Sequence, residues 1–241
     1  MEAMRRTVLG ILAGLLLVTA TSCTVTTKDP DYVTPAALPP LEQLKQAPVS
    51  QPTALAATGD VLAFVTEDRN IVCALTSAKG DNLNLPYETN SFADPANTKL
   101  ATVPIAHCEL AHYPKPDSKD IKDDCAGTGL GYLGGAALVR PDKAVYGECR
   151  SGVTQMEAEF GPKGTKNGPI SQLPVLEDGQ NIERNGLRCS AYNGGVACGN
   201  VSAGVAFFVS RSTYQLVEPP EPTQSPGTQA PTPATTAPKS A

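Results

Sequence analysis

Short apolar runs, separated by turn-forming residues, dominate the middle of the chain. They are rich in the β-branched and aromatic residues typical of strands, and they cover residues 61–66, 71–75, 102–110, 136–139, 144–149, 204–210 and 212–217. No long apolar stripe has the 3.6-residue period of a helix. Segments 76–100, 111–135 and 161–181 lack such runs and are expected to be long loops. The pattern predicts an all-β antiparallel fold, either a small sandwich or a barrel.

One hairpin can be placed in register from the sequence alone. Asn193-Gly194 is the strongest short signal for a two-residue type I′ turn. Counting outward from this turn places Cys189 directly opposite Cys198, in a non-hydrogen-bonded pair with Cα atoms about 4.5 Å apart. A disulfide tolerates Cα separations of about 4.4–6.8 Å. The sequence therefore predicts a Cys189–Cys198 disulfide within an antiparallel hairpin.

The N-terminus has the layout of a secretory signal. Arg5 and Arg6 precede an apolar run over residues 8–18, and small residues lead to Cys23. The run is shorter than the roughly 20 apolar residues that a spanning helix needs. The ending A-T-S-C resembles a bacterial lipobox, although Ala20 replaces the commoner Leu. We interpret residues 1–22 as a lipoprotein signal peptide and Cys23 as the lipid attachment site, with an incidental Cys23 as the alternative. Acyl chains on Cys23 would anchor the protein stably.

The remaining chain divides into three parts by composition. Residues 23–53 are rich in Pro and Thr and are interpreted as a tether, because prolines flank the short segment LEQLKQ that could form a helical turn. Residues 54–217 contain the apolar runs and suit a single domain. Residues 218–241 carry seven prolines and no large apolar side chain, so we expect a disordered tail.

Charge and cysteine content narrow the class of protein. Removal of residues 1–22 would change the net charge from −5 to −6, and an acidic chain without a basic run is a poor binder of nucleic acid. The six cysteines beyond Cys23 form an even set, typical of a disulfide framework in an exported protein. Once Cys189–Cys198 is fixed, about three connectivities remain. We favour the local pairs Cys73–Cys108 and Cys125–Cys149.

Motifs for metal and nucleotide binding do not fit their requirements. The only histidines, His107 and His112, flank Cys108, but an oxidising compartment would convert the thiolates that a metal needs into disulfides. The G-x-G-x-x-G of residues 129–134 lacks the preceding strand and the following helix of a dinucleotide site. The aspartates of residues 117–124 lack the spacing and the central Gly of a calcium loop. We expect no cofactor and no metal ligand.

Catalytic and glycan-binding patterns are equally sparse. No G-x-S-x-G motif occurs, and Ser210 beside Arg211 is interpreted as a strand-end serine next to a surface arginine. Stacking on sugars would need exposed aromatic side chains, but Trp is absent and the available rings near glycines are Tyr132, Tyr146 and Tyr192. We expect no catalytic residue.

Several short motifs between residues 61 and 214 together resemble a family of exported actinobacterial proteins whose six-cysteine domain is uncharacterised. They are Phe64 with Asn70-Ile71-x-Cys73, Cys108-Glu109-Leu110, Gly195-x-x-Cys198-x-Asn200 and Gly204-x-x-Phe207-x-x-Ser210-Arg211. The chain departs from the family at residues 66–69 (TEDR), where small residues, Pro and Gly are usual, and at 126–132, where a Trp is usual. The resemblance implies an exported, three-disulfide, β-rich accessory or binding module, and it supplies no catalytic residue.

The sequence therefore favours a non-enzymatic lipoprotein on the extracytoplasmic face of the cell membrane, which presents its domain to an envelope protein or glycan. A hydrolase acting on wall polymer or lipid is the rival, and it predicts a cleft with converging carboxylates or a Ser–His pair. A glycan-binding module is the third possibility, and it predicts a row of exposed tyrosines.

Overall fold

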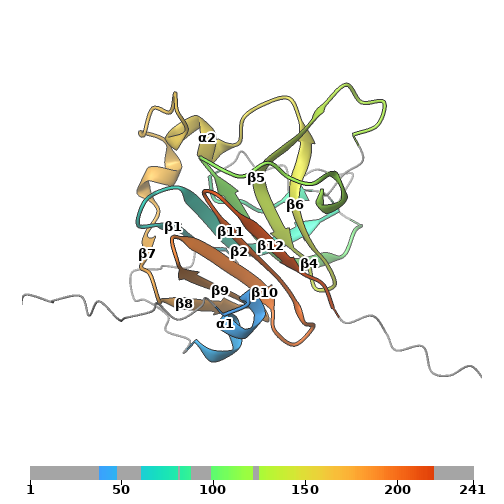
Figure 1. The fold of residues 1–241 in the computed structure, drawn as a ribbon, viewed down its shortest axis with the longest axis vertical. Helices are drawn as coiled ribbons and strands as arrows, with labels where there is room; N and C mark the ends of the chain where they lie inside the picture. The colour runs from blue at the N-terminus through green and yellow to red at the C-terminus, as the bar shows by residue number, and fades with distance from the viewer. Residues whose placement is uncertain (1–37, 48–60, 81, 88–98, 122–124, 220–241) are drawn as a thin grey trace, which may run out of the picture. The chain divides into compact units, whose positions relative to one another are not determined.

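A computed structural model describes residues 38–47, 61–80, 82–87, 99–121 and 125–219 (Figure 1). The predicted signal peptide, Cys23, most of the predicted tether and nearly all of the predicted tail lie outside these residues. None of the described helices has the length and apolar character needed to cross a membrane.

The described strands form two sheets. The larger has the order β6-β5-β4-β2-β1-β7, with β3 paired to β2, and is antiparallel except for the β1–β7 pair. Its strands are β1 (Leu62–Thr66), β2 (Ile71–Lys79), β3 (Asn82–Leu83), β4 (Thr102–Leu110), β5 (Gly131–Val139), β6 (Ala144–Arg150) and β7 (Val175–Leu176). The smaller sheet is an antiparallel meander of β8 (Asn181–Arg184), β9 (Leu187–Tyr192), β10 (Gly195–Asn200), β11 (Val205–Ser210) and β12 (Tyr214–Val217).

The two sheets pack face to face, which makes the fold a β-sandwich. Alternation along each strand sends one row of side chains inward. The larger sheet contributes Phe64, Cys73, Cys108, Ala137 and Tyr146, and the smaller contributes Ile182, Cys189, Cys198 and Phe207. All these side chains belong to one buried cluster. The sequence prediction of an antiparallel sandwich stapled by three disulfides is therefore confirmed.

Short helices cover the outer faces of both sheets. α2 (Gln155–Phe160) and the 3₁₀ helix η4 (Pro169–Gln172) place Met156 and Ile170 against the outer face of the larger sheet. α1 (Pro40–Gln46) lies on the smaller sheet (Figure 1). Leu44 is fully buried there, and its carbonyl accepts a hydrogen bond from Arg188. Residues 40–46, expected to belong to a tether, thus form part of the domain. Pro40 is the first residue of this helix. Proline suits this position because a backbone N–H in the first turn has no partner within the helix, so the missing N–H of proline costs no hydrogen bond.

The hairpin predicted around Asn193-Gly194 is present in the expected register. Tyr192 pairs with Gly195 and Cys189 pairs with Cys198. Asn193 and Gly194 have φ angles of 52° and 65°, as a type I′ turn requires. The structure pairs Cys189 with Cys198, Cys73 with Cys108 and Cys125 with Cys149, so the favoured connectivity is also confirmed.

The predicted loops contain elements that apolar runs did not reveal. β2 continues to Lys79, and β5 begins at Gly131 within the segment expected to be a loop. β5 carries a register irregularity between Leu133 and Ala137, and its glycine-rich start has too few apolar side chains to give the period of a strand. α2 and η4 were missed because each is under eight residues long, too short to show a helical period.

Candidate functional site

A hollow opens at the end of the sandwich where turns of the two sheets meet, and we call it the acidic hollow. Its volume is about 410 Å³, within the range of small-ligand pockets. The lining comes from the β1–β2 turn, β7 and the turn after it, β9 and the β9–β10 turn. It consists of Thr66, Glu67, Asp68, Leu176, Asp178, Ala191, Gly194 and Gly195. The hairpin identified in the sequence therefore forms one wall.

Parallel pairing of β1 with β7 brings the acidic residues together. Val65 and Thr66 pair with Val175 and Leu176, and in both segments the next two residues are Glu-Asp. Because parallel strands end at the same edge of a sheet, the two Glu-Asp pairs lie at one edge. Glu67, Asp68 and Asp178 line the hollow, and no Lys or Arg is among the lining residues that the structure describes.

The carboxylates of the hollow are held in different ways. Asp68 Oδ1 accepts hydrogen bonds from Thr66 Oγ1 at 2.7 Å and from the Asn70 backbone N–H at 3.0 Å, so it fixes the β1–β2 turn. The pKa of Asp178 is raised by partial burial and by the negative charge of Glu67, while a hydrogen bond from the Asn193 backbone N–H opposes the rise. A cation in the hollow would relieve this repulsion.

The floor of the hollow is apolar and its glycine wall is tightly packed. Leu176 and Ala191 are buried beneath the carboxylates. A Cβ on Gly195 would lie 2.5 Å from the Val209 carbonyl oxygen, so only glycine fits at this position. Apolar floor and acidic rim together match a ligand with an aliphatic stem and a cationic end.

The sequence did not identify Glu67, Asp68 or Asp178 as site residues. The signal available was the repeated segment Val-x-Glu-Asp at residues 65–68 and 175–178. The local sequence around these segments does not indicate that they pair in parallel, because they lie about 110 positions apart in the chain. Tertiary structure alone makes the two segments one acidic edge.

The two histidines do not form a nucleophile–base pair in the described part of the chain. His107 is buried, and its Nε2 lies 3.4 Å from Glu109 Oε1. Burial by itself would raise the pKa of Glu109, but the hydrogen bond and charge of His107 and the Met156 N–H lower it below its usual value. Ser210 Oγ instead accepts from the Thr213 N–H and donates to the Thr213 carbonyl, closing the β11–β12 turn.

A second polar cluster lies around Arg150 and is held together by contacts within the chain. Arg150 forms an ion pair with Glu157 at 2.7 Å and donates to the Gly134 carbonyl at 2.7 Å. Tyr113 Oη donates to Glu157, and Tyr146 Oη donates to the Pro114 carbonyl, each at 2.7 Å. These contacts join residues 111–121 to β5, β6 and α2. We interpret the cluster as structural, because its strong hydrogen bonds all go to other parts of the chain.

The tyrosines considered for sugar stacking are mostly internal. Tyr146 is fully buried and stacks on Tyr214, and Tyr192 is 9% exposed. Among the described tyrosines, Tyr132 alone is an exposed large side chain. The described surface therefore has no row of exposed tyrosines.

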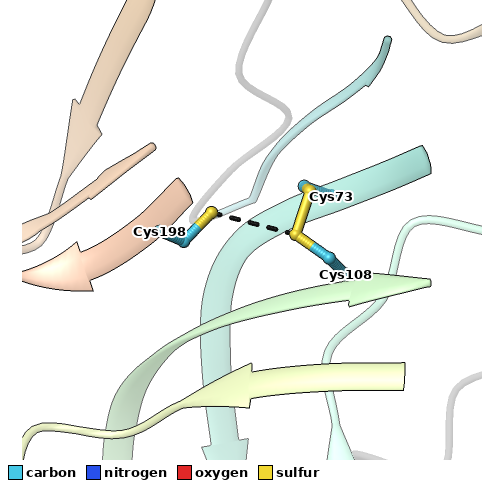
Figure 2. Close-up of side chains that lie close together, drawn as sticks. All are labelled: Cys73, Cys108 and Cys198. Carbon is cyan, nitrogen blue, oxygen red and sulfur yellow. Dashed lines mark hydrogen bonds between the residues drawn. A yellow bond between two sulfur atoms is a disulfide. The ribbon is translucent and has the colours of Figure 1, made fainter. Parts of the chain in front are cut away.

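The nearest approach to a metal-ligating cluster among the described residues is Cys73, Cys108 and Cys198, in the core (Figure 2). The sulfur atoms of Cys108 and Cys198 lie 3.8 Å apart. Each is bonded within a disulfide, so neither carries a proton, and the dashed contact in Figure 2 is packing of two disulfides rather than hydrogen bonding. Metal binding would require thiolates, which these bonds remove.

The fold and its disulfides define a class of protein, a two-sheet β-sandwich with one disulfide inside each sheet. A third disulfide joins Cys125, in the segment before β5, to Cys149 of β6. Comparison with known proteins adds nothing to this class: no family model, no curated protein and no solved structure matches the chain.

Proposed function

We propose that this protein is an exported, lipid-anchored binding module of the cell envelope, and that the acidic hollow receives a cationic group of its partner. The observation that carries the proposal is a hollow of about 410 Å³ whose described lining has three carboxylates and no cation. The partner is then an envelope protein or wall component that presents an ammonium group, such as a lysine side chain.

Elementary electrostatics supports a cationic ligand. Each carboxylate about 4 Å from an ammonium contributes roughly 1 kcal/mol in water and about 4 kcal/mol near a protein surface of lower effective dielectric. Glu67 and Asp68 are exposed, so the lower part of this range applies to them. The aliphatic stem of a lysine could contact Leu176 and Ala191 while its ammonium stays at the rim.

Disulfide content supports export, and Cys23 supports anchoring. Three disulfides are typical of proteins from oxidising compartments. A Cys23→Ser variant should move the protein from the membrane fraction to the medium, if Cys23 carries the lipid. Retention of that variant on the membrane would contradict the lipid anchor and leave the hollow to be tested separately.

The hollow is tested by titrating the mature protein with a trilysine peptide while recording backbone amide NMR shifts. Shifts should concentrate at Ala191, Gly194 and Gly195, which line the hollow. A Glu67→Gln/Asp178→Asn variant should bind about tenfold more weakly, equivalent to about 1.4 kcal/mol.

Two controls make this test specific. The variant Glu177→Gln removes a neighbouring exposed carboxylate that does not line the hollow, so binding should be unchanged. A triglutamate peptide should cause no shifts. Equal affinity of the double variant and the wild-type protein would refute the proposal.

A hydrolase acting on wall polymer is the second candidate, favoured by one observation. Asp178, with its raised pKa, and the nearby Glu67 resemble a proton donor beside an ionised carboxylate. If this candidate holds, the wild-type protein releases reducing ends from purified wall polymer and Asp178→Asn does not. Wild-type protein without such activity eliminates it.

A further inference from the structure

A second hollow also includes a residue of the β1–β2 turn, and we call it the basic hollow. Its volume is about 470 Å³, and it is lined by Arg69, Phe160, Lys166, Asn167, Ser171 and Gln172. Arg69 directly follows Glu67 and Asp68 of the acidic hollow. One turn therefore directs acidic side chains to one hollow and a basic side chain to the other.

The basic hollow carries two cations in a chain of net charge −5. No carboxylate is among the described residues that line it. Within the described part of the chain, neither Arg69 nor Lys166 forms an ion pair with Asp or Glu. Both charges are therefore available to a ligand.

The guanidinium of Arg69 is oriented before any ligand binds. One of its terminal nitrogens donates to the Ser171 carbonyl at 3.3 Å, and the group lies 5.9 Å from the centre of the Phe160 ring. Among the described residues, the other N–H groups of this planar fork have no hydrogen-bond partner, and they suit two oxygens of one anion. Orientation in advance reduces the entropy lost on binding.

A buried carboxylate holds the backbone of η4, which carries Ser171 and Gln172 of the basic hollow. Glu159 is 2% exposed and accepts hydrogen bonds from the backbone N–H groups of Ile170 and Ser171, both at 3.1 Å. The Lys166 N–H donates to the Glu159 carbonyl at 2.9 Å. The negative charge of Glu159 offsets one cation in part, yet its oxygens are occupied from within the chain, which leaves the open side positive.

Both cationic residues have left-handed backbone conformations. Their φ angles are 51° for Arg69 and 58° for Lys166. Apart from glycine, this region is normally occupied by Asn or Asp, and the other two described non-glycine residues with positive φ are indeed asparagines. Residues held in unfavourable conformations concentrate at functional sites. Arg69 and Lys166, the two exceptions to this preference, both line the basic hollow.

We propose that the basic hollow binds the phosphate group of a phosphorylated saccharide or polyol. Arg69 supplies a fork for two phosphate oxygens, and Lys166 supplies a second positive charge. The hollow is larger than a phosphate alone requires, and the side-chain amides of Asn167 and Gln172 at its rim are suited to hydroxyl groups. The ligand can be a soluble or wall-borne sugar phosphate, or the headgroup of a phosphoinositide-type lipid, since both present the same chemistry.

The experiment titrates the mature protein with glucose 6-phosphate, inorganic phosphate and glucose, following backbone amide NMR shifts. Glucose 6-phosphate should shift Ser171 and Gln172, inorganic phosphate should act on the same residues more weakly, and glucose should have no effect. Co-sedimentation with phosphatidylcholine vesicles, with and without phosphatidylinositol, tests the lipid source. Binding to either source through these residues supports the proposal, and binding to neither overturns it.

Variants that tolerate the left-handed conformation separate ligand binding from folding. Arg69→Asn and Lys166→Asn each remove a charge at a position where asparagine is acceptable, so the melting temperature should show a folded domain. Each should weaken binding about tenfold, whereas Lys143→Ala, in the exposed β5–β6 turn, should not. Unchanged affinity in both asparagine variants would overturn the proposal.

Discussion

Two disulfides face each other in the core of the sandwich, and removing each in turn tests what holds the sheets. Cys73–Cys108 joins residues 35 positions apart, and Cys189–Cys198 joins residues 9 apart. The loop-entropy model assigns them about 3.8 and about 2.7 kcal/mol. All four side chains are fully buried, so replacement by alanine removes similar packed volume in both cases. We predict that Cys73→Ala/Cys108→Ala loses about 1 kcal/mol more stability than Cys189→Ala/Cys198→Ala.

Equilibrium unfolding in urea measures this difference directly. For a domain of this size, 1 kcal/mol corresponds to a melting temperature change of about 2–4 °C, so calorimetry provides a second readout. Cys125→Ala/Cys149→Ala is the matched control, because its sequence separation of 24 is intermediate and Cys149 lies in a partly exposed part of β6. If the shorter loop costs as much as the longer one, packing rather than loop closure governs these disulfides.

The contact between the two disulfides makes a separate prediction. In the variant Cys73→Ala/Cys189→Ala, Cys108 and Cys198 keep sulfur atoms that lie 3.8 Å apart in the native protein. Because facing sheets pack about 10 Å apart, a local approach of β4 and β10 together with side-chain rotation should bring them to the bonding distance of about 2.05 Å, forming a disulfide that links the two sheets. Peptide mapping without reductant should find this bond, and two free thiols in the oxidised protein would show that the sheets cannot approach.

Two further predictions concern the larger sheet. Gly134→Ala should destabilise the protein by about 1–3 kcal/mol, because a Cβ would lie 2.5 Å from the Pro114 carbonyl oxygen and 2.7 Å from Tyr146 Oη; Gly131→Ala, which meets nothing within 4 Å, should be nearly neutral in the same unfolding assay. Glu109→Gln should cost about 1–3 kcal/mol of stability near neutral pH. The pKa of Glu109 is lowered in the folded protein, so its ionised carboxylate stabilises the fold at pH values above its unfolded pKa of about 4.3. This stabilisation disappears as the pH falls through the folded pKa. Unfolding curves from about pH 7 to about pH 3 should therefore converge for the two proteins, and a constant gap would show that the charge of Glu109 does not matter.

The sequence by itself determined the features that depend on local geometry. Alternating apolar runs predicted most strands of both sheets, and the Asn193-Gly194 turn fixed the hairpin register and hence the Cys189–Cys198 disulfide. A two-residue turn allows only one pairing register of the hairpin strands, so counting residues outward from the turn is sufficient to find the opposed cysteines. The sequence also supplied two Val-x-Glu-Asp segments and the basic residues near them, without indicating that they form sites.

Tertiary structure decided how distant segments combine. The parallel β1–β7 pair, the packing of α1 on the smaller sheet and the hydrogen bond from Arg69 to the Ser171 carbonyl all join residues far apart in the chain. Their segments are too short to show a period, and their partners are chosen by packing of the whole domain rather than by local preference. Both hollows arise from these long-range contacts, which is why the candidate sites became visible only in the folded protein.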